Sequence, residues 1–381
     1  MNNCLEILKD LLRFPSFTTE GVNALSKHII KHYLEPENIP YHKIPSGDRT
    51  NLLVFVNKDF SDNQSSGLVM SGHLDTVEGY IPVKEENGKL YGRGTVDMLF
   101  FTAVLLSLIP YFKTLPYPVL FSLTADEETT FLGIEAVLKF CQENRIQPKY
   151  CILGEPTDFA LTLNNQGTLV FDTTFQGKAA HSSMPKLGSN AIETAVAFIN
   201  LLKQNADIND NPDNSITYNI AKIKAGVADN IIPDTCSLLY SFRFSNPTEE
   251  ALIRRIQAKT EQAVYQQSKL PITTTTPLYI KSFDNKGSPL AKRITSALPE
   301  IRIQPFSGAT EAGYWHEYGA DTLVFGINDQ KMSHTENEHI PIQSLQTYAE
   351  QLKVICNALC PPTKALDCTV NVFDNERIAD Q

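Results

Sequence analysis

The chain has 381 residues, which is too long for one ordinary hydrophobic core, so we expect two domains. Its composition, 42% hydrophobic and 20% charged, is typical of a soluble globular protein. The formal net charge is −10 and no run of Lys or Arg occurs, which argues against a nucleic-acid partner.

The first part of the chain alternates between helix and strand patterns. Helices are predicted at 3–13 and 21–33, strands at 51–57 and 67–72, a helix at 98–112, a strand at 117–124, a helix at 131–143 and a strand at 149–153. This βαβ alternation predicts an α/β fold with a mainly parallel sheet and helices on both faces.

The pattern changes at Gly167. A strand with alternating apolar residues begins there, followed by a helix at 190–203, strands at 215–224 and 235–244, a helix at 249–267 and a β-type run at 272–280. The order β-α-β-β-α-β is the ferredoxin-like arrangement. A helix at 288–298, a strand at 321–326 and a helix at 343–358 then resume the α/β pattern.

We therefore expect an α+β domain inserted into an α/β domain. The boundaries that the pattern predicts are 1–165 together with 279–360 for the α/β domain, 166–278 for the insertion and 361–381 for a C-terminal extension.

Location is predicted from three features. The N-terminal residues form an amphipathic helix pattern with charges, which is unlike a signal peptide. The most apolar stretch, 98–112, is about 15 residues and too short to span a bilayer. Seven scattered cysteines without a Cys-x-x-Cys pair favour free, mostly buried thiols in a reducing compartment. We expect a cytoplasmic protein without a membrane partner.

Metal-type side chains follow the apolar strand patterns. His73 and Asp75 come after the strand at 67–72, and Asp126-Glu127-Glu128 come after the strand at 117–124. Glu155 follows the strand at 149–153, His334 lies shortly after the strand at 321–326, and Asp97 opens the apolar helix. Ligands of open α/β sheets collect at the carboxyl ends of the strands, so this spacing suits a site for two divalent ions.

Each of these residues also has an ordinary structural interpretation. His73 could end a strand beside a turn residue, Asp97 could cap a helix, and the adjacent Glu127 and Glu128 could form a solvated first turn. Glu155 could lie in a surface turn and His334 in a loop. Spacing alone leaves the metal site and these interpretations evenly balanced. Because Asp75 stands two residues after His73, its carboxylate could accept the second imidazole N–H.

Seven ordered motifs between about residues 5 and 358 resemble the M20 metallopeptidase family. They are Gly72-His73-Leu-Asp75-Thr-Val, Tyr91-Gly-Arg-Gly-Thr-Val-Asp97-Met, Thr124-Ala-Asp-Glu127-Glu128-Thr, Leu153-Gly-Glu155-Pro-Thr, Gly177-Lys-Ala-Ala-His181-Ser-Ser, Ala228-Asp-Asn230-Ile-Ile-Pro-Asp and the late His334. Within the family the acetylornithine deacetylase branch is the most similar, with the succinyl-diaminopimelate desuccinylases as close relatives.

The resemblance implies a site for two metal ions, of which zinc is the first expectation and cobalt an alternative. Asp97 would bind both ions. His73 and Glu155 would complete the ligands of one ion, and Glu128 and His334 those of the other. The catalytic residues would be Glu127, as general acid and base, and Asp75, as the partner of His73. Such a site would hydrolyse the amide of a small-molecule N-acyl amino acid.

The resemblance also assigns roles to the inserted domain. It would serve as a lid and dimerisation domain, so the expected partner is a second copy of the chain. Its residues His181, Asn230 and Arg243 would contact substrate, with His181 reaching the partner's site. The chain departs from its relatives after Asp97-Met, where Leu99-Phe100 replaces a Lys-Gly pair and could reshape the nearby substrate pocket.

A last motif bears on the substrate. The stretch Ser307-Gly-Ala-Thr-Glu311-Ala-Gly resembles the acetylornithine deacetylase branch, and an anionic Glu311 in the pocket would favour a substrate with a distal ammonium group. Hydrolysis of N2-acetyl-L-ornithine, a step of arginine biosynthesis, is therefore expected. The alternatives are a desuccinylase, a family dipeptidase or aminopeptidase, and a catalytically silent metal-binding scaffold.

Overall fold

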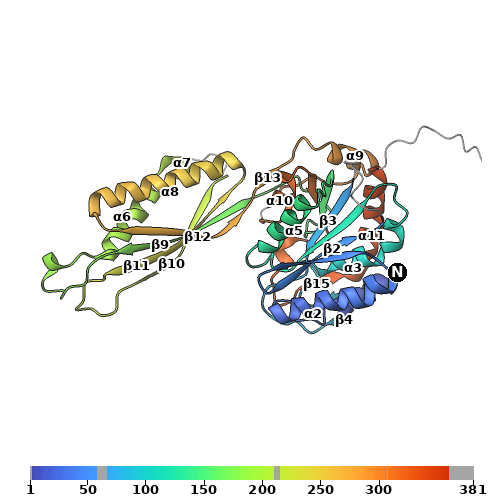
Figure 1. Cartoon of the computed structure of the whole chain (residues 1–381), viewed down its shortest axis with the longest axis horizontal. Helices are drawn as coiled ribbons and strands as arrows, with labels where there is room; N and C mark the ends of the chain where they lie inside the picture. Colours follow the sequence, from blue (N-terminus) through green and yellow to red (C-terminus); the bar gives the residue numbers. More distant parts are fainter. Residues whose placement is uncertain (1, 58–66, 210–214, 307, 360–381) are drawn as a thin grey trace, which may run out of the picture.

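The structure is a computed structural model and describes residues 2–57, 67–209, 215–306 and 308–359. Figure 1 shows two lobes, one built around a six-stranded sheet and the other around a four-stranded sheet. The predicted C-terminal extension at 361–381 lies outside the described residues.

The six-stranded sheet has the order β1-β2-β6-β3-β7-β14. Its strands are β1 (Tyr41–Ser46), β2 (Arg49–Phe55), β3 (Leu68–His73), β6 (Val119–Thr124), β7 (Tyr150–Leu153) and β14 (Asp321–Val324). The four strands from β6 to β14 are parallel, whereas β2 runs antiparallel to both of its neighbours. The predicted α/β fold with a mainly parallel sheet is confirmed.

Helices cover both faces of this sheet. The contacts of α5 (Leu132–Glu143) and α10 (Ala312–Glu317) lie on one face. The other face packs against a larger group: α1 (Asn2–Leu11), α2 (Thr19–Ile29), α3 (Leu99–Ser107), α4 (Ile109–Phe112), α9 (Pro289–Ala297) and α11 (Ile342–Ala358). Helical turns η1 (Ile30–Leu34), η2 (Glu35–Glu37) and η4 (Gln330–Met332) complete the lobe.

The central strands explain this layering. Leu68 and Met70 of β3 belong to the hydrophobic cluster on one face, while Val69 belongs to the cluster on the other. Successive side chains of a strand point to opposite faces, so a strand covered on both sides must be apolar throughout. Leu99 and Phe100, where the chain departs from its relatives, are fully buried in the first cluster.

Two small sheets lie beside the main one. A three-stranded sheet contains β4 (Lys84–Glu86), β5 (Lys89–Tyr91) and β15 (His339–Pro341), and a two-stranded sheet contains β8 (Asn164–Asn165) and β13 (Phe283–Asp284). Pairing of β5 with β15 brings the loop before α3 close to the segment after His334.

The second lobe contains a four-stranded sheet in the order β10-β11-β9-β12, and helices cover one face of it. Its elements are β9 (Gly167–Gln176), η3 (Pro185–Leu187), α6 (Ala191–Lys203), α7 (Ala206–Asn209), β10 (Thr217–Ala225), β11 (Thr235–Phe244), α8 (Pro247–Ser268) and β12 (Ile272–Ile280). Neighbouring strands are antiparallel, and α6 and α8 bury one face of the sheet in a separate core. The ferredoxin-like arrangement is confirmed, while the boundaries of the insertion at 166 and 278 stay a prediction.

Two further expectations concern membranes and thiols. Among the described residues, no helix combines the length and apolar composition that crossing a bilayer requires. No disulfide joins the described cysteines, and Cys141, Cys151 and Cys236 are buried.

Candidate metal centre

Three neighbouring parallel strands deliver polar side chains to one edge of the sheet. His73 is the last residue of β3, Glu127 and Glu128 follow β6, and Glu155 follows β7. Asp97 lies just before α3, after a loop that starts at the end of β5. The carboxyl ends of β6, β3 and β7 are adjacent, because these strands are hydrogen-bonded neighbours in the sheet.

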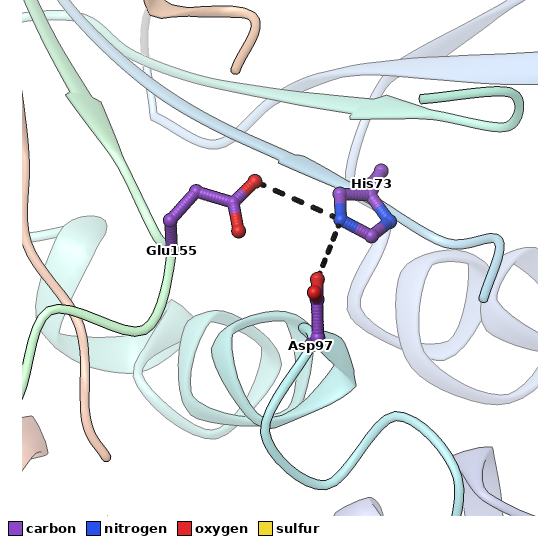
Figure 2. A group of neighbouring side chains, drawn as sticks. All are labelled: His73, Asp97 and Glu155. Carbon is purple, nitrogen blue, oxygen red and sulfur yellow. Dashed lines mark hydrogen bonds and ion pairs between the residues drawn. The ribbon is translucent and has the colours of Figure 1, made fainter. Parts of the chain in front are cut away.

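Asp97 presents its two carboxylate oxygens to two different histidines. Its Oδ1 lies 3.0 Å from His73 Nε2, and its Oδ2 lies 3.2 Å from His334 Nε2. Figure 2 shows the first group, in which Glu155 Oε1 is 3.7 Å from His73 Nε2. In the second group, Glu128 Oε1 is 3.1 Å from His334 Nε2. The donor atoms of each group lie within 4.8 Å of one another, as the ligands of a single ion would.

Glu127 lies beside these groups without being part of either. Its Oε2 is 3.9 Å from His73 Nε2, and the residue is 8% exposed. Glu127 and Glu128 are adjacent in sequence, yet Glu128 contacts His334 while Glu127 faces the His73 side.

Burial and charge act against each other in this cluster. Burial raises the pKa of Glu127 and of Glu155 well above the usual range, because it removes water from a carboxylate and neighbouring carboxylates add repulsion. Burial also opposes ionisation of Asp97, but its hydrogen bonds with His334 and His73 lower its pKa. The His334 pKa is raised to about 10, first by its hydrogen bonds to Asp97 and Glu128.

The charges of the cluster fit divalent cations. Four carboxylates meet here, those of Asp97, Glu127, Glu128 and Glu155, and they outnumber the two imidazoles and Arg243 in the same cavity. When all four carboxylates are ionised, negative charge remains in excess even with both imidazoles protonated. Imidazole nitrogens with carboxylate oxygens are the donor set of zinc, cobalt and manganese sites.

Asp75 lies in a different position from the one its spacing predicts. The Nδ1 of His73 donates to the main-chain carbonyl of Asp75 at 2.8 Å, whereas the Asp75 carboxylate is 3.6 Å away, beyond hydrogen-bond length. The prediction assumed a continuing strand, but β3 ends at His73 and the chain turns. The carbonyl contact places the proton on Nδ1 and leaves Nε2 facing Asp97.

The Asp75 carboxylate instead organises the turn after β6. It accepts hydrogen bonds from the main-chain N–H groups of Glu127 and Glu128, each at 3.1 Å, and Arg49 Nη1 lies 3.4 Å away. Burial raises the pKa of Asp75 to about 6. Asp75 thus connects the strand end that bears His73 with the turn that bears both glutamates.

Glu311 is placed away from the cavity, which contradicts its predicted contact with substrate. It is 1% exposed, and its Oε2 accepts a hydrogen bond from Ser71 Oγ at 3.3 Å. Its Oε1 has no hydrogen-bond partner among the described residues, and burial raises its pKa to about 8. Glu311 directly precedes α10, which packs against β7 and β14. Trp315 of α10 donates a hydrogen bond to Ser71 of β3, so the position of this helix directs Glu311 into the interior.

A cavity of about 260 Å³ opens over the two histidine groups. The residues that line it include Asp97, Glu127, Glu128, Glu155 and His334, together with Thr129, Phe131, Pro156, Arg243, Leu278, Ile280, Phe306, Gly308, Ala309 and Gln330. Leu99 and Phe100 are not among them. A larger cavity of about 820 Å³ between α1, α3 and α11 contains none of the predicted site residues.

Of the three predicted substrate-contacting residues of the insertion, only one lies at the cavity. Arg243 of β11 lines the cavity and donates a hydrogen bond to the Thr168 hydroxyl. His181 and Asn230 lie elsewhere, on two exposed loop segments joined by a hydrogen bond from Ser182 N to the Asn230 carbonyl at 2.9 Å. Within one chain, the structure therefore brings Arg243 to the metal-type residues but not His181 or Asn230.

One buried residue of the site has no counterpart among the predicted ones. Glu338 is fully buried and accepts hydrogen bonds from the loop that ends at Asp97. Its sequence signal is weak, because a glutamate in the polar stretch after His334 is also typical of a solvated loop.

Comparison with known proteins places these features in a family. Residues 69–358 match the description "Peptidase family M20/M25/M40". An acetylornithine deacetylase from Aliivibrio fischeri is 31% identical over 300 residues, covering 72% of this chain and 76% of its own length. One from Buchnera aphidicola subsp. Schizaphis graminum is 26% identical over 386 residues, covering 93% and 98%.

Solved structures share the fold. A tripeptidase from Staphylococcus aureus subsp. aureus mu50 superposes with a TM-score of 0.77 at 20% identity, covering 94% of this chain and 98% of its own. A Bacillus subtilis protein described as a dinuclear metal binding peptidase of the M20 family has a TM-score of 0.66 at 13% identity, with 93% and 97% covered. With its fold, its two histidine–carboxylate groups and this match over most of its length, the chain belongs to peptidase family M20/M25/M40, a family of metal-dependent hydrolases.

Proposed function

We propose that this M20-family hydrolase is a di-metal deacylase that converts N2-acetyl-L-ornithine into L-ornithine and acetate, a step of arginine biosynthesis. The observation that carries the proposal is the shared Asp97, whose two oxygens face two separate histidine–carboxylate groups inside a cavity that also contains Arg243. The choice of substrate rests on the relatives named acetylornithine deacetylase.

Two ions would be held by the two groups. His73, Asp97 and Glu155 would bind one, and Asp97, Glu128 and His334 the other, with zinc as the proposed metal and cobalt as the alternative. When bound, such ions polarise the acyl carbonyl and lower the pKa of water.

Glu127 would transfer the proton that amide hydrolysis requires. Its carboxylate belongs to neither ligand group and lines the cavity. Burial raises its pKa, which brings it toward the pH at which one group can both accept and return a proton. We propose that Glu127 takes the proton of the attacking water and passes it to the amide nitrogen as the C–N bond breaks.

Arg243 would orient the substrate. Arg243 lines the same cavity as the carboxylates, and the planar fork of N–H donors of a guanidinium can bind the α-carboxylate of an amino acid through two hydrogen bonds. Because the predicted contact of Glu311 with a distal ammonium group is contradicted, the ornithine side chain would meet other residues of the cavity wall.

His181 and Asn230 would act across a dimer. Both lie on exposed segments of the inserted lobe, away from the cavity of their own chain. We propose that a second copy of the chain pairs through this lobe and that His181 reaches the partner's cavity.

Steady-state rates on a panel of substrates would test the proposal. The panel contains N2-acetyl-L-ornithine, N-succinyl-LL-diaminopimelate and dipeptides, each measured with added Zn²⁺ or Co²⁺. The kcat/KM for acetylornithine should exceed that for the succinylated substrate by tenfold or more, about 1.4 kcal/mol of transition-state discrimination. The reverse ranking would make the chain a desuccinylase, and a preference for dipeptides would make it a peptidase.

A further inference from the structure

Three main-chain donors of the loop that ends at Asp97 are directed at a single side-chain oxygen. The N–H groups of Gly94, Val96 and Asp97 lie 3.0, 2.8 and 3.2 Å from Glu338 Oε1. Buried N–H groups need acceptors, and this loop belongs to no helix or strand that would supply them. One side chain from a distant part of the sequence therefore supplies the acceptor for three N–H groups of this segment.

The second oxygen of Glu338 has its own partner. Arg93 Nη1 donates to Glu338 Oε2 at 2.8 Å, and Arg93 Nε donates to the Gly79 carbonyl at 3.0 Å. Glu338 is 0% exposed, and a fully buried carboxylate is tolerated when it is paired and hydrogen-bonded in this way. The group thus has a fixed position from which the loop can be held.

Main-chain contacts join the same two segments. Gly92 N donates to the Glu338 carbonyl at 3.2 Å, and His339 of β15 pairs with Tyr91 of β5. Glu338 also lies only four residues after His334. The segment that carries one predicted ligand is therefore fastened to the loop that carries another.

We infer that Glu338 is a positioning residue that sets the place of the Asp97 carboxylate between His73 and His334. The inference rests on the proposed two-metal site, and it adds to it the group that preorganises the shared ligand. Because the two Asp97 oxygens lie 3.0 and 3.2 Å from the two imidazoles, a shift of the loop would disturb both groups together. Residues that hold a ligand in place typically contribute 10- to 100-fold to metal affinity.

Metal titration of the full chain, without substrate, tests this role. Metal-free wild type, Glu338→Gln and the control Glu336→Gln are titrated with Zn²⁺ against a chromogenic chelator, at a temperature where thermal unfolding shows each to be folded. Glu336 is exposed, so its variant matches the chemical change outside the contact. Glu338→Gln should bind both ions about 10- to 100-fold more weakly, while the control should bind like wild type.

Two results would overturn the inference. One is wild-type affinity for both ions in folded Glu338→Gln, and the other is a loss confined to one ion. If Glu338→Gln fails to fold, Arg93→Gln provides the same test, because it removes the hydrogen-bond donor of one Glu338 oxygen. This variant should bind both ions about tenfold more weakly than wild type, and an unchanged affinity would equally overturn the inference. Absence of acetylornithine hydrolysis by the wild type would remove the proposed substrate and leave the affinity result standing.

Discussion

The carboxylate of Asp97 is the one predicted ligand common to both histidine groups, so its loss should differ in kind from the loss of any other. Asp97→Ala should abolish binding of both ions, whereas Glu155→Ala should weaken the binding of one ion much more than that of the other. Metal content after dialysis, measured by mass spectrometry, distinguishes these results. Glu143→Ala, an exposed position on α5, is the control. Two tightly held ions in Asp97→Ala would refute the shared role.

Loss of the Glu127 carboxylate should lower kcat without lowering the affinity for metal. Since it belongs to neither group, Glu127→Gln should keep two ions and lose about 10²- to 10⁴-fold in kcat, because the amide cannot accept the proton of water. Metal content and turnover are measured on the same preparation. If metal is lost in proportion to activity, Glu127 is a ligand and the assignment of the two adjacent glutamates must be exchanged.

Glu311 should make the metal-free protein sensitive to pH. Burial raises its pKa from 4.5 to about 8, so the folded chain binds a proton that the unfolded chain releases between these values. The contribution of protonated Glu311 to the free energy of unfolding is therefore fully present below about pH 4.5. It is lost as the pH rises to about 8, and its size is on the order of a few kcal/mol.

Comparison with Glu311→Gln isolates this contribution, since glutamine cannot ionise. Urea unfolding of the metal-free proteins at pH 5.5 and pH 8 should show that the wild type loses a few kcal/mol more than the variant over this interval. Equal losses in the two proteins would mean that Glu311 ionises normally and has access to water or a partner.

At the level of elements, the approach of α3 to the end of β7 places Glu155. A Cβ added at Gly154 would lie 2.1 Å from Phe101 Cγ of α3, and the ring is fully buried. Gly154→Ala should therefore cost about 1–3 kcal/mol through overpacking and should reduce activity by displacing the adjacent Glu155. Gly287→Ala, where nothing lies within 4 Å, should leave the unfolding midpoint almost unchanged. Equal midpoints for the two variants would show that the helix can move aside.

Elements with strong periodicity are the ones that the sequence predicts well. The apolar strands β3, β6 and β7 and the alternating β9 have the predicted character, because burial on two faces or one leaves a clear pattern. Strand β1 is absent from the predicted elements: its sequence Tyr-His-Lys-Ile-Pro-Ser buries only Ile44, and it depends on pairing with β2. A strand stabilised mainly by its neighbour leaves little trace in its own composition.

The residues of the site likewise divide into those that local sequence patterns predict and those whose positions depend on tertiary packing. That His73, Asp97 and Glu155 would converge follows from strand ends and family motifs, since both specify where the backbone leaves the sheet. The direction of a side chain after a turn is set by tertiary packing, so the carboxylates of Asp75 and Glu311 lie elsewhere than predicted. The contacts of Glu338 join segments more than 240 residues apart and have no local signature.

For the whole molecule, the exposed position of His181 makes the proposed dimer testable by mixing. His181→Ala should lower kcat while fold and metal content stay intact, because the residue lies outside the core of either lobe. If His181 serves the partner's cavity, mixing His181→Ala with Glu127→Gln should restore part of the activity once subunits exchange, since one cavity of a mixed dimer contains both native groups. Absence of recovery after demonstrated exchange would mean that each chain supplies its own His181.

The two crossings between the lobes lie side by side, since Thr168 at the start of β9 pairs with Ile280 at the end of β12. Paired residues of antiparallel strands are about 4.5–5.5 Å apart at their Cα atoms, a gap that a tight turn can close. The chain therefore leaves the larger lobe and returns to it at practically one point. Because of this junction, the smaller lobe can be deleted or exchanged without changing the strand order of the sheet that holds the histidine groups. A short hairpin in place of the lobe would connect the same two chain ends.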